Sequence, residues 1–548
     1  MLKKSYRICL TLVFLLSFAA SAFAADKAAL SKLIILHTND THGYHLRDAS
    51  RGVNGLAAIA GLKKQYENMG FNVILLDAGD AIQDNNLVNL SKGATAIQFF
   101  NAVGYDAATF GNHEFDYGQD VLLQRISEAN YKYLCANVIV EATGQLFAPA
   151  ASAIIDKGGV KVGVFGLVTP TTKTGSHPKN VRGLKFLEKE DMYACAENEA
   201  RKLKAQGADV VIALAHLGSE EANAGNNSED IIRNAPSVDL IIDGHDHRVK
   251  INRIDDEVQA ETGCYTQNAG VVRYFNDQWQ STVIPYGALN PRDDDKQVAK
   301  LVQVAQKAVD KQMASKIGVS MVTLDGTRFP GVRTQEMNSG DFFADAYLWQ
   351  ARQLYKENTV DGAIINGGSI RASVNAGKVL EADIRRSIPY DNELAIVPIT
   401  GAKLYEILES ASCATPDAMG AFPQVAGISY TIDTTKKFVP GNRYPRSDYH
   451  APEKIGNRIK DVKVNGQPVE LDKIYRIVVA SFIACGGDAY GGLTAPDDAT
   501  FIAPLECPGV FYFGCTEVDG TINFIKSELG GVIGEEYAQP QGRITIIK

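Results

Sequence analysis

Short apolar runs alternate with amphipathic stretches from residue 33 to about residue 286. The apolar runs are short and rich in leucine and β-branched residues, so they predict buried strands, whereas the stretches between them have the apolar spacing of helices. The predicted strands are Leu33 to Leu36, Val73 to Leu76, Ala107 to Phe110, Val160 to Leu167, Val210 to Ala215 and Leu240 to Ile242; the predicted helices are Ala57 to Asn68, Ala94 to Val103, Gln119 to Ala129 and Asp191 to Ala205. This alternation is typical of a layered α/β domain.

A long amphipathic segment follows, opened by Asp293 and ending near Gly318. Its apolar residues recur at helical spacing with lysines between them, which predicts a linker helix. A second region, Gly331 to Lys548, then has strands and helices of its own. Its predicted strands are Ala363 to Ile365, Leu394 to Ile399, Ile428 to Ile432 and Ile474 to Val479, and its predicted helices are Ser339 to Tyr355 and Ala402 to Ala411.

The first 24 residues have the pattern of a secretory signal peptide. Lys3, Lys4 and Arg7 precede the apolar stretch Ile8 to Phe18, and Ala22-Phe23-Ala24 supplies small residues for cleavage. The sequence has no second apolar stretch long enough to span a bilayer. We therefore expect a periplasmic or secreted protein without a stable membrane anchor.

Charge and length narrow the class of protein further. The formal net charge is −9, and removal of the three positive charges of the signal takes it to about −12. Such an acidic chain is not expected to bind a nucleic acid polymer. With 548 residues the chain is longer than a single hydrophobic core usually supports, which indicates two or more domains. The oligomeric state is left open.

Acidic and histidine residues cluster directly after the predicted strands of the first region. The clusters are His-Thr-Asn-Asp-Thr-His-Gly (37 to 43), Asp-Ala-Gly-Asp (77 to 80), Gly-Asn-His-Glu-Phe-Asp (111 to 116), Ala-His-Leu-Gly (215 to 218) and Gly-His-Asp-His (244 to 247). Five of the nine histidines lie there as candidate ligands or catalytic groups. Because loops at the carboxyl ends of parallel strands converge, these clusters should meet in one cleft.

The clusters have the composition of a site for two metal ions. Carboxylates, imidazoles and an amide oxygen suit Zn, Mn, Co, Fe or Mg, and a carboxylate can bridge two cations. Any one of these residues could instead be a helix cap, a turn former or a buried histidine, but the whole set favours metal. The candidate ligands are Asp40, His42, Asp80, Asn112, His216, His245 and His247. We expect His37 to support the ligands from behind and His45 to be a solvent or loop residue.

These clusters resemble the signature motifs of the calcineurin-like metallophosphoesterases, and in particular of the 5'-nucleotidase family, over nearly all of the mature chain. The resemblance implies an α/β protein with a four-layer sandwich domain (25–292), a linker helix (293–330) and a second α/β, nucleotide-binding domain (331–548). It implies that one metal is held by Asp40, His42, Asp80 and His247, and the other by Asp80, Asn112, His216 and His245. His113 and Asp116 match the family's catalytic dyad.

The chemistry expected of such a site is phosphoester hydrolysis without a covalent intermediate. Two cations lower the pKa of a bound water, which then attacks phosphorus in line. His113 is not needed as a ligand, so we expect it to stabilise charge on the phosphoryl group or to protonate the leaving oxygen, with Asp116 orienting it.

Three loops of the second region carry the residues expected to select the substrate. The loops are Asn-Gly-Gly-Ser-Ile-Arg (366 to 371), Ile-Pro-Tyr-Asp-Asn (388 to 392) and Ser-Phe-Ile-Ala-Cys-Gly-Gly-Asp (481 to 488). Each alone is more typical of a tight turn or a core aromatic. Their similarity to the C-terminal domain of the 5'-nucleotidase family implies that Tyr390 and Phe482 stack on the base, Asn366 and Asn392 contact it, Asp488 binds the ribose, and Arg371 and Arg333 reach the phosphate. Position 390 is tyrosine where the family more often has phenylalanine.

The sequence thus predicts an exported enzyme that hydrolyses nucleoside 5'-monophosphates, with UDP-sugars and other nucleotide diphosphates as further candidate substrates. The alternative enzyme is a 2',3'-cyclic nucleotide phosphodiesterase with 3'-nucleotidase activity, and a thiosulfohydrolase of related fold is more distant. A surface-binding protein that keeps the fold is the alternative from another class, but such a protein has no need of all seven ligands together with His113 and Asp116.

Overall fold

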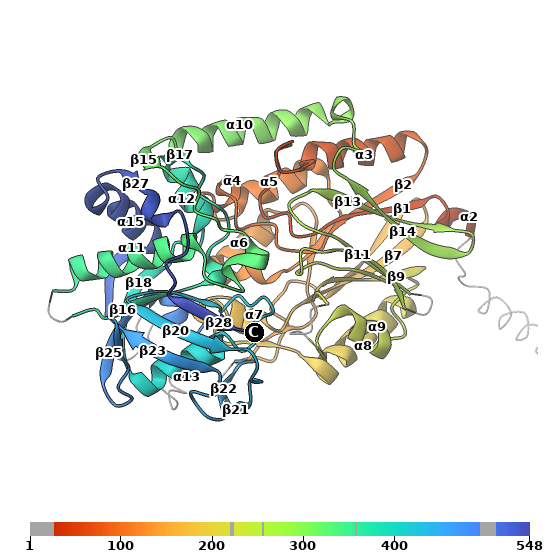
Figure 1. Ribbon diagram of the computed structural model, residues 1–548. Coiled ribbons are helices and arrows are strands. Elements are labelled where there is room, and N and C mark those ends of the chain that lie inside the picture. Colours follow the sequence, from red (N-terminus) through yellow and green to blue (C-terminus); the bar gives the residue numbers. More distant parts are fainter. Residues whose placement is uncertain (1–26, 220–223, 255–256, 357–358, 446, 494–510) are drawn as a thin grey trace, which may run out of the picture.

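The computed structural model describes residues 27–219, 224–254, 257–356, 359–445, 447–493 and 511–548, so the predicted signal peptide lies outside it. Figure 1 shows an N-terminal and a C-terminal part lying side by side, each with sheets and covering helices. None of the helices within these ranges is long and apolar enough to cross a membrane.

The N-terminal part contains two six-stranded sheets. The first has the order β14 (Gln278–Pro285), β13 (Asn268–Phe275), β1 (Leu33–Thr38), β2 (Asn72–Asp77), β3 (Ala107–Thr109) and β4 (Lys132–Leu134). The second has the order β11 (Val249–Ile254), β12 (Glu257–Thr262), β10 (Leu240–Ile242), β9 (Val210–His216), β7 (Val160–Val168) and β6 (Ser152–Lys157). Neighbouring strands are parallel from β1 to β4 and from β7 through β9 and β10 to β12, and the remaining pairs are antiparallel.

The two sheets pack face to face with helices outside them, which confirms the α/β sandwich of four layers. In β1, Leu33 and Ile35 belong to the core between the sheets, whereas Ile34 and Leu36 belong to the core beneath the outer helices. Because both faces of such a strand are buried, its sequence is a continuous apolar run. Helices α3 (Leu56–Asn68), α5 (Ala94–Val103) and α6 (Gln119–Glu128) cover the first sheet, and α8 (Lys189–Ala205) and α9 (Ser228–Asn234) cover the second.

Helix α10 (Lys296–Gln312) joins the two parts and is shorter than predicted. Asp295 caps its N-terminus by accepting the amide hydrogens of Gln297 and Val298, both at 2.9 Å. Its apolar residues, among them Val298 and Val302, pack on the outer helices of the N-terminal part. The predicted end near Gly318 is wrong, because strand β15 (Lys316–Ser320) begins there and pairs with two strands of the C-terminal part. In Figure 1, α10 runs along the top of the molecule to β15.

The C-terminal part is a second α/β unit built on a five-stranded sheet. The sheet has the order β19 (Pro423–Ala426), β16 (Gly362–Asn366), β25 (Ile474–Ala480), β18 (Glu393–Thr400) and β26 (Phe511–Thr516). Helices α11 (Asn338–Leu354) and α15 (Glu517–Asn523) pack on one face, and α13 (Gly401–Ala411) packs on the other. Two smaller sheets contain β17 (Gly377–Leu380), β15 and β27 (Val532–Ile533), and β24 (Gln467–Pro468), β23 (Ile459–Val464), β20 (Ile428–Asp433) and β28 (Ile544–Ile547).

Shorter elements complete both parts. They are α2 (Lys27–Leu30), α4 (Asn86–Asn89), α7 (Thr172–Gly175), α12 (Glu381–Ser387), α14 (Ser481–Ala484), and the two-stranded pairs β5 (Val138–Val140) with β8 (Leu184–Phe186) and β21 (Pro440–Arg443) with β22 (His450–Pro452). Several of them lie where the two parts meet.

His37 of the first motif and His45, which follows it, both lie in the core. Of the two expectations for His45, the loop is confirmed and the position in solvent is wrong, because the side chain is buried against Phe99 and Phe100. His37 is also buried, and neither of its ring nitrogens makes a hydrogen bond to the described residues. Burial lowers the pKa of both imidazoles to about 3, so the folded protein holds them neutral.

These neutral histidines should make the protein less stable in mild acid. Below a pH of about 6.5 the unfolded chain binds a proton at each histidine that the folded state does not accept, so stability falls as the pH falls. From about pH 7.5 to about pH 5, each should cost about 2 kcal/mol of unfolding free energy. Urea denaturation of the metal-free protein at the two pH values should therefore show a loss that His45→Leu reduces by about this amount.

Thr41→Val is the matched control, because the Thr41 hydroxyl lies 3.2 Å from Nε2 of His45. That variant removes the hydrogen bond but keeps the imidazole, so it should change stability equally at both pH values. If His45→Leu leaves the pH dependence as it is in the wild type, His45 does not contribute to it.

Candidate metal centre

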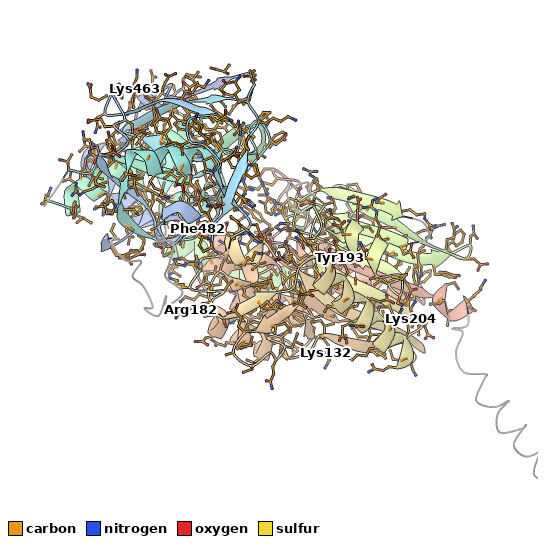
Figure 2. The ribbon with its side chains drawn as sticks, turned by 90° about the horizontal axis from the view of Figure 1, so that it is seen from below. Lys132, Arg182, Tyr193, Lys204, Lys463 and Phe482 are labelled. Atoms are coloured by element: carbon orange, nitrogen blue, oxygen red, sulfur yellow. The ribbon has the colours of Figure 1, made fainter. Side chains whose placement is uncertain are left out.

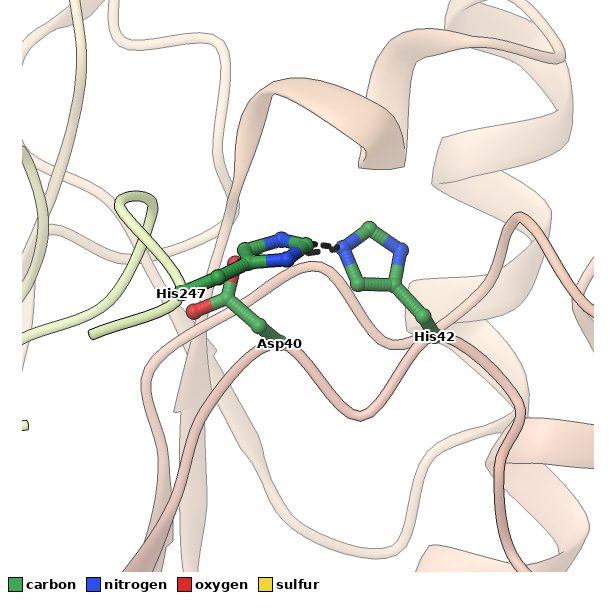
Figure 3. A group of neighbouring side chains, drawn as sticks. All are labelled: Asp40, His42 and His247. Atoms are coloured by element: carbon green, nitrogen blue, oxygen red, sulfur yellow. Dashed lines mark hydrogen bonds and ion pairs between the residues drawn. The ribbon is translucent and has the colours of Figure 1, made fainter. Parts of the chain in front are cut away.

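The structure brings the seven predicted metal ligands together at the ends of the strands. Nε2 of His42 lies 3.6 Å from Asp80 and 3.1 Å from Nε2 of His247. Asp40 lies 3.3 Å from Nε2 of His247 and 3.9 Å from Nε2 of His216, which is also 3.1 Å from Asp80. These contacts join loops that follow β1, β2, β9 and β10, and Figure 3 shows Asp40, His42 and His247 facing one another.

The remaining two ligands adjoin this group. Nδ1 of His245 lies 3.0 Å from the side-chain oxygen of Asn112, and the His245 ring lies edge-on to His216 at 5.2 Å. The main-chain N–H of His245 donates to Asp40 at 2.9 Å. His245 and Asn112 therefore adjoin the group formed by Asp40, His42, Asp80, His216 and His247.

Main-chain carbonyls orient two of the imidazoles. Nδ1 of His42 lies 3.0 Å from the carbonyl oxygen of Gln83, and Nδ1 of His216 lies 2.7 Å from that of Ala78. Each carbonyl favours the tautomer with the proton on Nδ1, which leaves the lone pair of Nε2 facing the carboxylates. Burial lowers the pKa of His42 well below its ordinary value, and a neutral imidazole is the form that binds a metal.

Two buried polar atoms in this group lack a hydrogen bond to any described residue and are of a type that binds metal cations. Oδ1 of Asp40 and Nε2 of His216 are both buried and make no hydrogen bond with the described residues. Although Oδ1 of Asp40 lies 3.3 Å from His247 and Nε2 of His216 lies 3.1 Å from Asp80, a buried polar atom without a hydrogen bond is costly, so a bound cation would stabilise both. Two sets have ligand atoms close enough to hold one ion, namely Asp40 with His42 and His247, and Asp40 with Asp80 and His216. The donor set of carboxylates and imidazoles suits divalent transition metals or Mg.

Five of the seven candidate ligands have a left-handed backbone. Their φ angles are 48° for Asp40, 48° for His42, 59° for Asp80, 97° for His245 and 59° for His247. Residues other than glycine rarely adopt positive φ, and such residues cluster at functional sites. The turns redirect the chain directly after a strand, so that successive loops aim their side chains at one point.

Two glycines permit the close approach of these loops. A Cβ at Gly111 would lie 2.1 Å from Oδ1 of Asp80, and a Cβ at Gly244 would lie 2.7 Å from Oδ2 of Asp40. Any side chain at either position would displace a candidate ligand.

Sequence reasoning assigned no role to two residues that fix the ligand loops. The Glu114 carboxylate accepts the amide hydrogens of Asp80 at 2.8 Å, Ala81 at 2.8 Å and Gly111 at 2.5 Å, and so ties the loop after β2 to the loop after β3. The Asn39 amide donates to Asp40 at 2.7 Å, while its oxygen accepts from Thr262. Both stand inside the motifs, but only their contacts reveal what they do.

His113 and Asp116 form a pair beside the cluster. Nδ1 of His113 lies 2.6 Å from the Asp116 carboxylate. The His113 ring lies 5.3 Å from the ring of His42 on one side and 6.0 Å from that of Tyr390 on the other. Although burial acts to lower it, the carboxylates of Asp116 and Asp80 raise the pKa of His113 above its ordinary value. With Nδ1 held by Asp116, Nε2 is the nitrogen that can serve a substrate.

Some predicted substrate residues of the C-terminal part have side chains that contact the N-terminal part, and others have side chains that contact residues of their own part. Arg371 and Tyr390 reach the N-terminal part, where Arg371 lies 3.7 Å from Asp84 and Tyr390 stacks on His113. Asn366 donates to Asp488 at 2.9 Å. Asn392 donates to the buried Glu517, with its main-chain N–H at 3.1 Å and its side-chain amide at 3.3 Å.

Phe482 lies in the short helix α14, which follows β25. It packs against Gly487 of its own loop, and no ring contact joins it to Tyr390 in the described ranges. In Figure 2, Phe482 lies on the side of the C-terminal part that borders the N-terminal part, whereas Lys463 lies on the far side. The expected pair of stacking rings is thus not in mutual contact.

A third arginine joins Arg371 and Arg333 and was missed as a site residue. Arg328 lies 3.2 Å from Nδ1 of His247. Burial, together with the charges of Arg328 and Arg371, lowers the pKa of Arg333 to about 9. Such crowding of like charges indicates an anion site. The signal was present in the segment Arg-Phe-Pro-Gly-Val-Arg (328 to 333), which carries two arginines.

The two parts of the chain touch at several further places. Asn86 donates to the carbonyl of Ala382 at 3.1 Å, which joins α4 to α12. On α7, Lys173 pairs with Asp448 at 2.9 Å, and the neighbouring Thr174 carbonyl accepts the amide hydrogen of Asp488 at 2.9 Å. The metal ligands and the arginines therefore face one another across an interface between two domains.

In comparisons with known proteins, the two parts of the chain match two different family models. Residues 33–249 match the family model of the calcineurin-like phosphoesterases, and residues 316–495 match that of the 5'-nucleotidase C-terminal domain. A 5'-nucleotidase of Vibrio cholerae is 28% identical over 530 residues, which cover 87% of this chain and 88% of that protein. The trifunctional nucleotide phosphoesterase protein YfkN of Bacillus subtilis is 29% identical over 516 residues, or 85% of this chain, and this chain spans only 33% of its length.

A solved structure shares the fold over both domains. The 5'-nucleotidase precursor from Thermus thermophilus superposes with a TM-score of 0.76 at 24% identity, covering 94% of this chain and 99% of that one.

Proposed function

Because the chain belongs to the calcineurin-like phosphoesterases that carry a 5'-nucleotidase C-terminal domain, we propose that it hydrolyses nucleoside 5'-monophosphates to nucleoside and phosphate. The observation that carries the proposal is the meeting of a candidate metal-binding cluster with partly buried arginines across one domain interface. Arg328 from the C-terminal domain lies 3.2 Å from His247, a candidate metal ligand of the other. A phosphate bound there would contact both sets.

We assign the candidate ligands to two metal sites as the family resemblance implies. Asp40, His42, Asp80 and His247 would hold one divalent cation, and Asp80, Asn112, His216 and His245 the other; the contacts of His42, His216 and His247 with Asp80 and Asp40, and of His245 with Asn112, support this division. When bound, the two cations would polarise the phosphoryl group and supply a water of lowered pKa as the nucleophile. Asp80 would bridge them, because its carboxylate lies within 3.6 Å of an imidazole from each group. Which metals are bound stays open.

His113 and the arginines would act on the substrate itself. Nε2 of His113 would donate a proton to the leaving oxygen or stabilise charge on the phosphoryl group, and Asp116 would keep the ring cationic and oriented. Arg371, Arg333 and Arg328 would bind phosphate oxygens through charge-assisted hydrogen bonds. Each role uses a group that already faces the cleft.

The C-terminal domain would choose the nucleotide. Tyr390 and Phe482 would stack on the base, Asn366 and Asn392 would contact it, and Asp488 would bind ribose hydroxyls. Stacking on an aromatic ring contributes about 1 to 3 kcal/mol per base. We also propose that the protein is exported, on the signal pattern of residues 1–24.

Phosphate release from a panel of nucleotides tests the function. AMP, UMP, UDP-glucose and 2',3'-cyclic AMP should be compared with and without a chelator. We expect the fastest release from the 5'-monophosphates and loss of release with chelator. Metal-dependent release from none of the four would contradict the enzyme, and release from the cyclic nucleotide alone would favour the phosphodiesterase instead.

A cross-link between the domains should block turnover. We infer that product leaves when the domains move apart, since candidate ligands and arginines of opposite domains would contact the phosphate. The contact between Asn86 and Ala382 offers a place for the paired variant Asn86→Cys and Ala382→Cys. We expect turnover to be lost in molecules that carry the disulfide and to return with reductant.

Metal content should stay the same in both redox states of that variant, and each single cysteine variant should be active with or without reductant. Normal turnover in the cross-linked form would show that domain opening is not required.

A further inference from the structure

Asp84 has a conformation and an environment that are unusual for an aspartate. Its φ is 113°, in the region that favours glycine, and its side chain is 2% exposed. Its Oδ2 is buried and makes no hydrogen bond within the described residues. The loop around it is fixed, because the Asn89 side chain accepts the amide hydrogen of Asp84 at 2.9 Å and donates to its carbonyl at 3.1 Å. Backbone strain and an unsatisfied buried carboxylate both cost stability, so their combination points to function.

The carboxylate lies among the cations of the proposed phosphate site. Oδ1 of Asp84 is 3.7 Å from Nε of Arg371, which is itself 7% exposed and belongs to the other domain. Arg371, His113 and Arg328 all act electrostatically on Asp84. At 3.7 Å the pair is too long for a hydrogen bond, so the Asp84 carboxylate balances the charge of Arg371 without saturating its donors.

We propose that Asp84 determines specificity by limiting the negative charge that a substrate can bring into the cleft. The inference rests on the proposed nucleotidase function and adds to it a preference among substrates. A monophosphate can be held by the cations of the site, whereas the extra charge of a diphosphate or triphosphate would lie near a carboxylate that water does not screen. Repulsion between like charges at this depth is strong enough to discriminate between ligands that differ by one charge.

Asp84→Asn keeps the shape of the side chain and removes its charge. We expect the ratio of kcat/KM for ADP to that for AMP to rise about tenfold in this variant, because one repulsion near the added phosphate is gone. Asp84→Glu keeps the charge and is the matched control, with the ratio expected to stay near that of the wild type. Asp84→Gly removes both charge and strain, so it should show the same raised ratio and a higher Tm.

The outcomes separate this inference from the proposed function. If the wild type hydrolyses AMP and the ratio is unchanged in both Asp84→Asn and Asp84→Gly, the charge-limiting role is wrong. If the wild type releases phosphate from no nucleotide, the proposed function fails, but calorimetric titration with AMP and with ADP still measures the preference without turnover. Equal gains in affinity for AMP and ADP in Asp84→Asn would also overturn the role, since a general change in the site would affect both alike.

Discussion

Asp80→Asn should bind fewer metal ions than the wild type and should lower turnover by at least about 10³-fold. Loss of a residue that only hydrogen-bonds to a metal ligand already lowers metal affinity or activity by about 10- to 100-fold, and loss of a ligand should cost more. The carboxylate of Asp80 lies 3.6 Å from Nε2 of His42 and 3.1 Å from Nε2 of His216, so both candidate sites share it. Asparagine keeps an oxygen for the His113 amide hydrogen, which Asp80 accepts at 2.9 Å, but it lacks the charge that two cations need. Metal analysis by mass spectrometry and phosphate release from AMP would measure the two effects.

Asp77→Asn provides the matched control. Asp77 is an equally buried aspartate that ends β2, three residues before Asp80, but its oxygens accept hydrogen bonds from the Thr38 hydroxyl at 2.6 Å and the Gly79 amide at 3.0 Å. Its replacement should leave metal content near that of the wild type. Two tightly bound ions and full activity in Asp80→Asn would contradict the bridging role.

His113→Ala should lower kcat by about 10²- to 10⁴-fold, the usual contribution of a positioned acid or base. The expected loss comes from proton transfer or charge stabilisation, since neither of the two groups of ligand atoms found among the described residues includes the His113 imidazole. Metal content and the fold should therefore be unchanged. Steady-state kinetics on AMP, together with metal analysis, would separate this result from a loss of metal.

Two further measurements test the assignment of His113. Imidazole added to His113→Ala should restore part of the activity, because it can occupy the space that the ring leaves. Asp116→Asn should have a smaller effect on kcat, since it removes the orienting carboxylate at 2.6 Å but keeps the imidazole. An undiminished rate in His113→Ala with both metals present would assign the proton transfer to another group.

The strands that build the site were predictable because they are buried on both faces. The predicted run Leu240 to Ile242 coincides with β10, and Val210 to Ala215 is one residue shorter than β9. Because both faces of such a strand are apolar, its sequence is a continuous apolar run, which is easy to recognise. The hairpin of β13 (Asn268–Phe275) and β14 (Gln278–Pro285) was not predicted, because one strand is polar along much of its length and partly exposed.

The apolar periodicity predicted the linker helix but not the residue at which it ends. The apolar spacing predicted a helix to about Gly318, yet the helix ends at Gln312 and β15 begins at Lys316. Strand β15 exists because it pairs with β17 and β27, which lie far along the chain. Partners of this kind cannot be read from a local pattern.

The candidate ligands were identifiable from residue type and position, but their supports were not. Asp40 and His247 stand out because few side chains other than acids and histidines bind metals. Glu114 and Asn39 act through hydrogen bonds to the backbone and side chains of the loops, so their residue types alone suggest ordinary turn formers. Arg328 needed the fold to bring it from the C-terminal domain to His247.

The left-handed turns at the ligands mean that the protein is preorganised for its metals. Asp40, His42 and Asp80 have φ angles of 48°, 48° and 59°, and the sandwich of sheets holds them so. Folding of the sandwich therefore already holds the backbone at these φ angles. Binding of a cation then needs to order little of the backbone. Affinity for the metals should accordingly depend on the rigidity of the first sheet as much as on the ligands themselves.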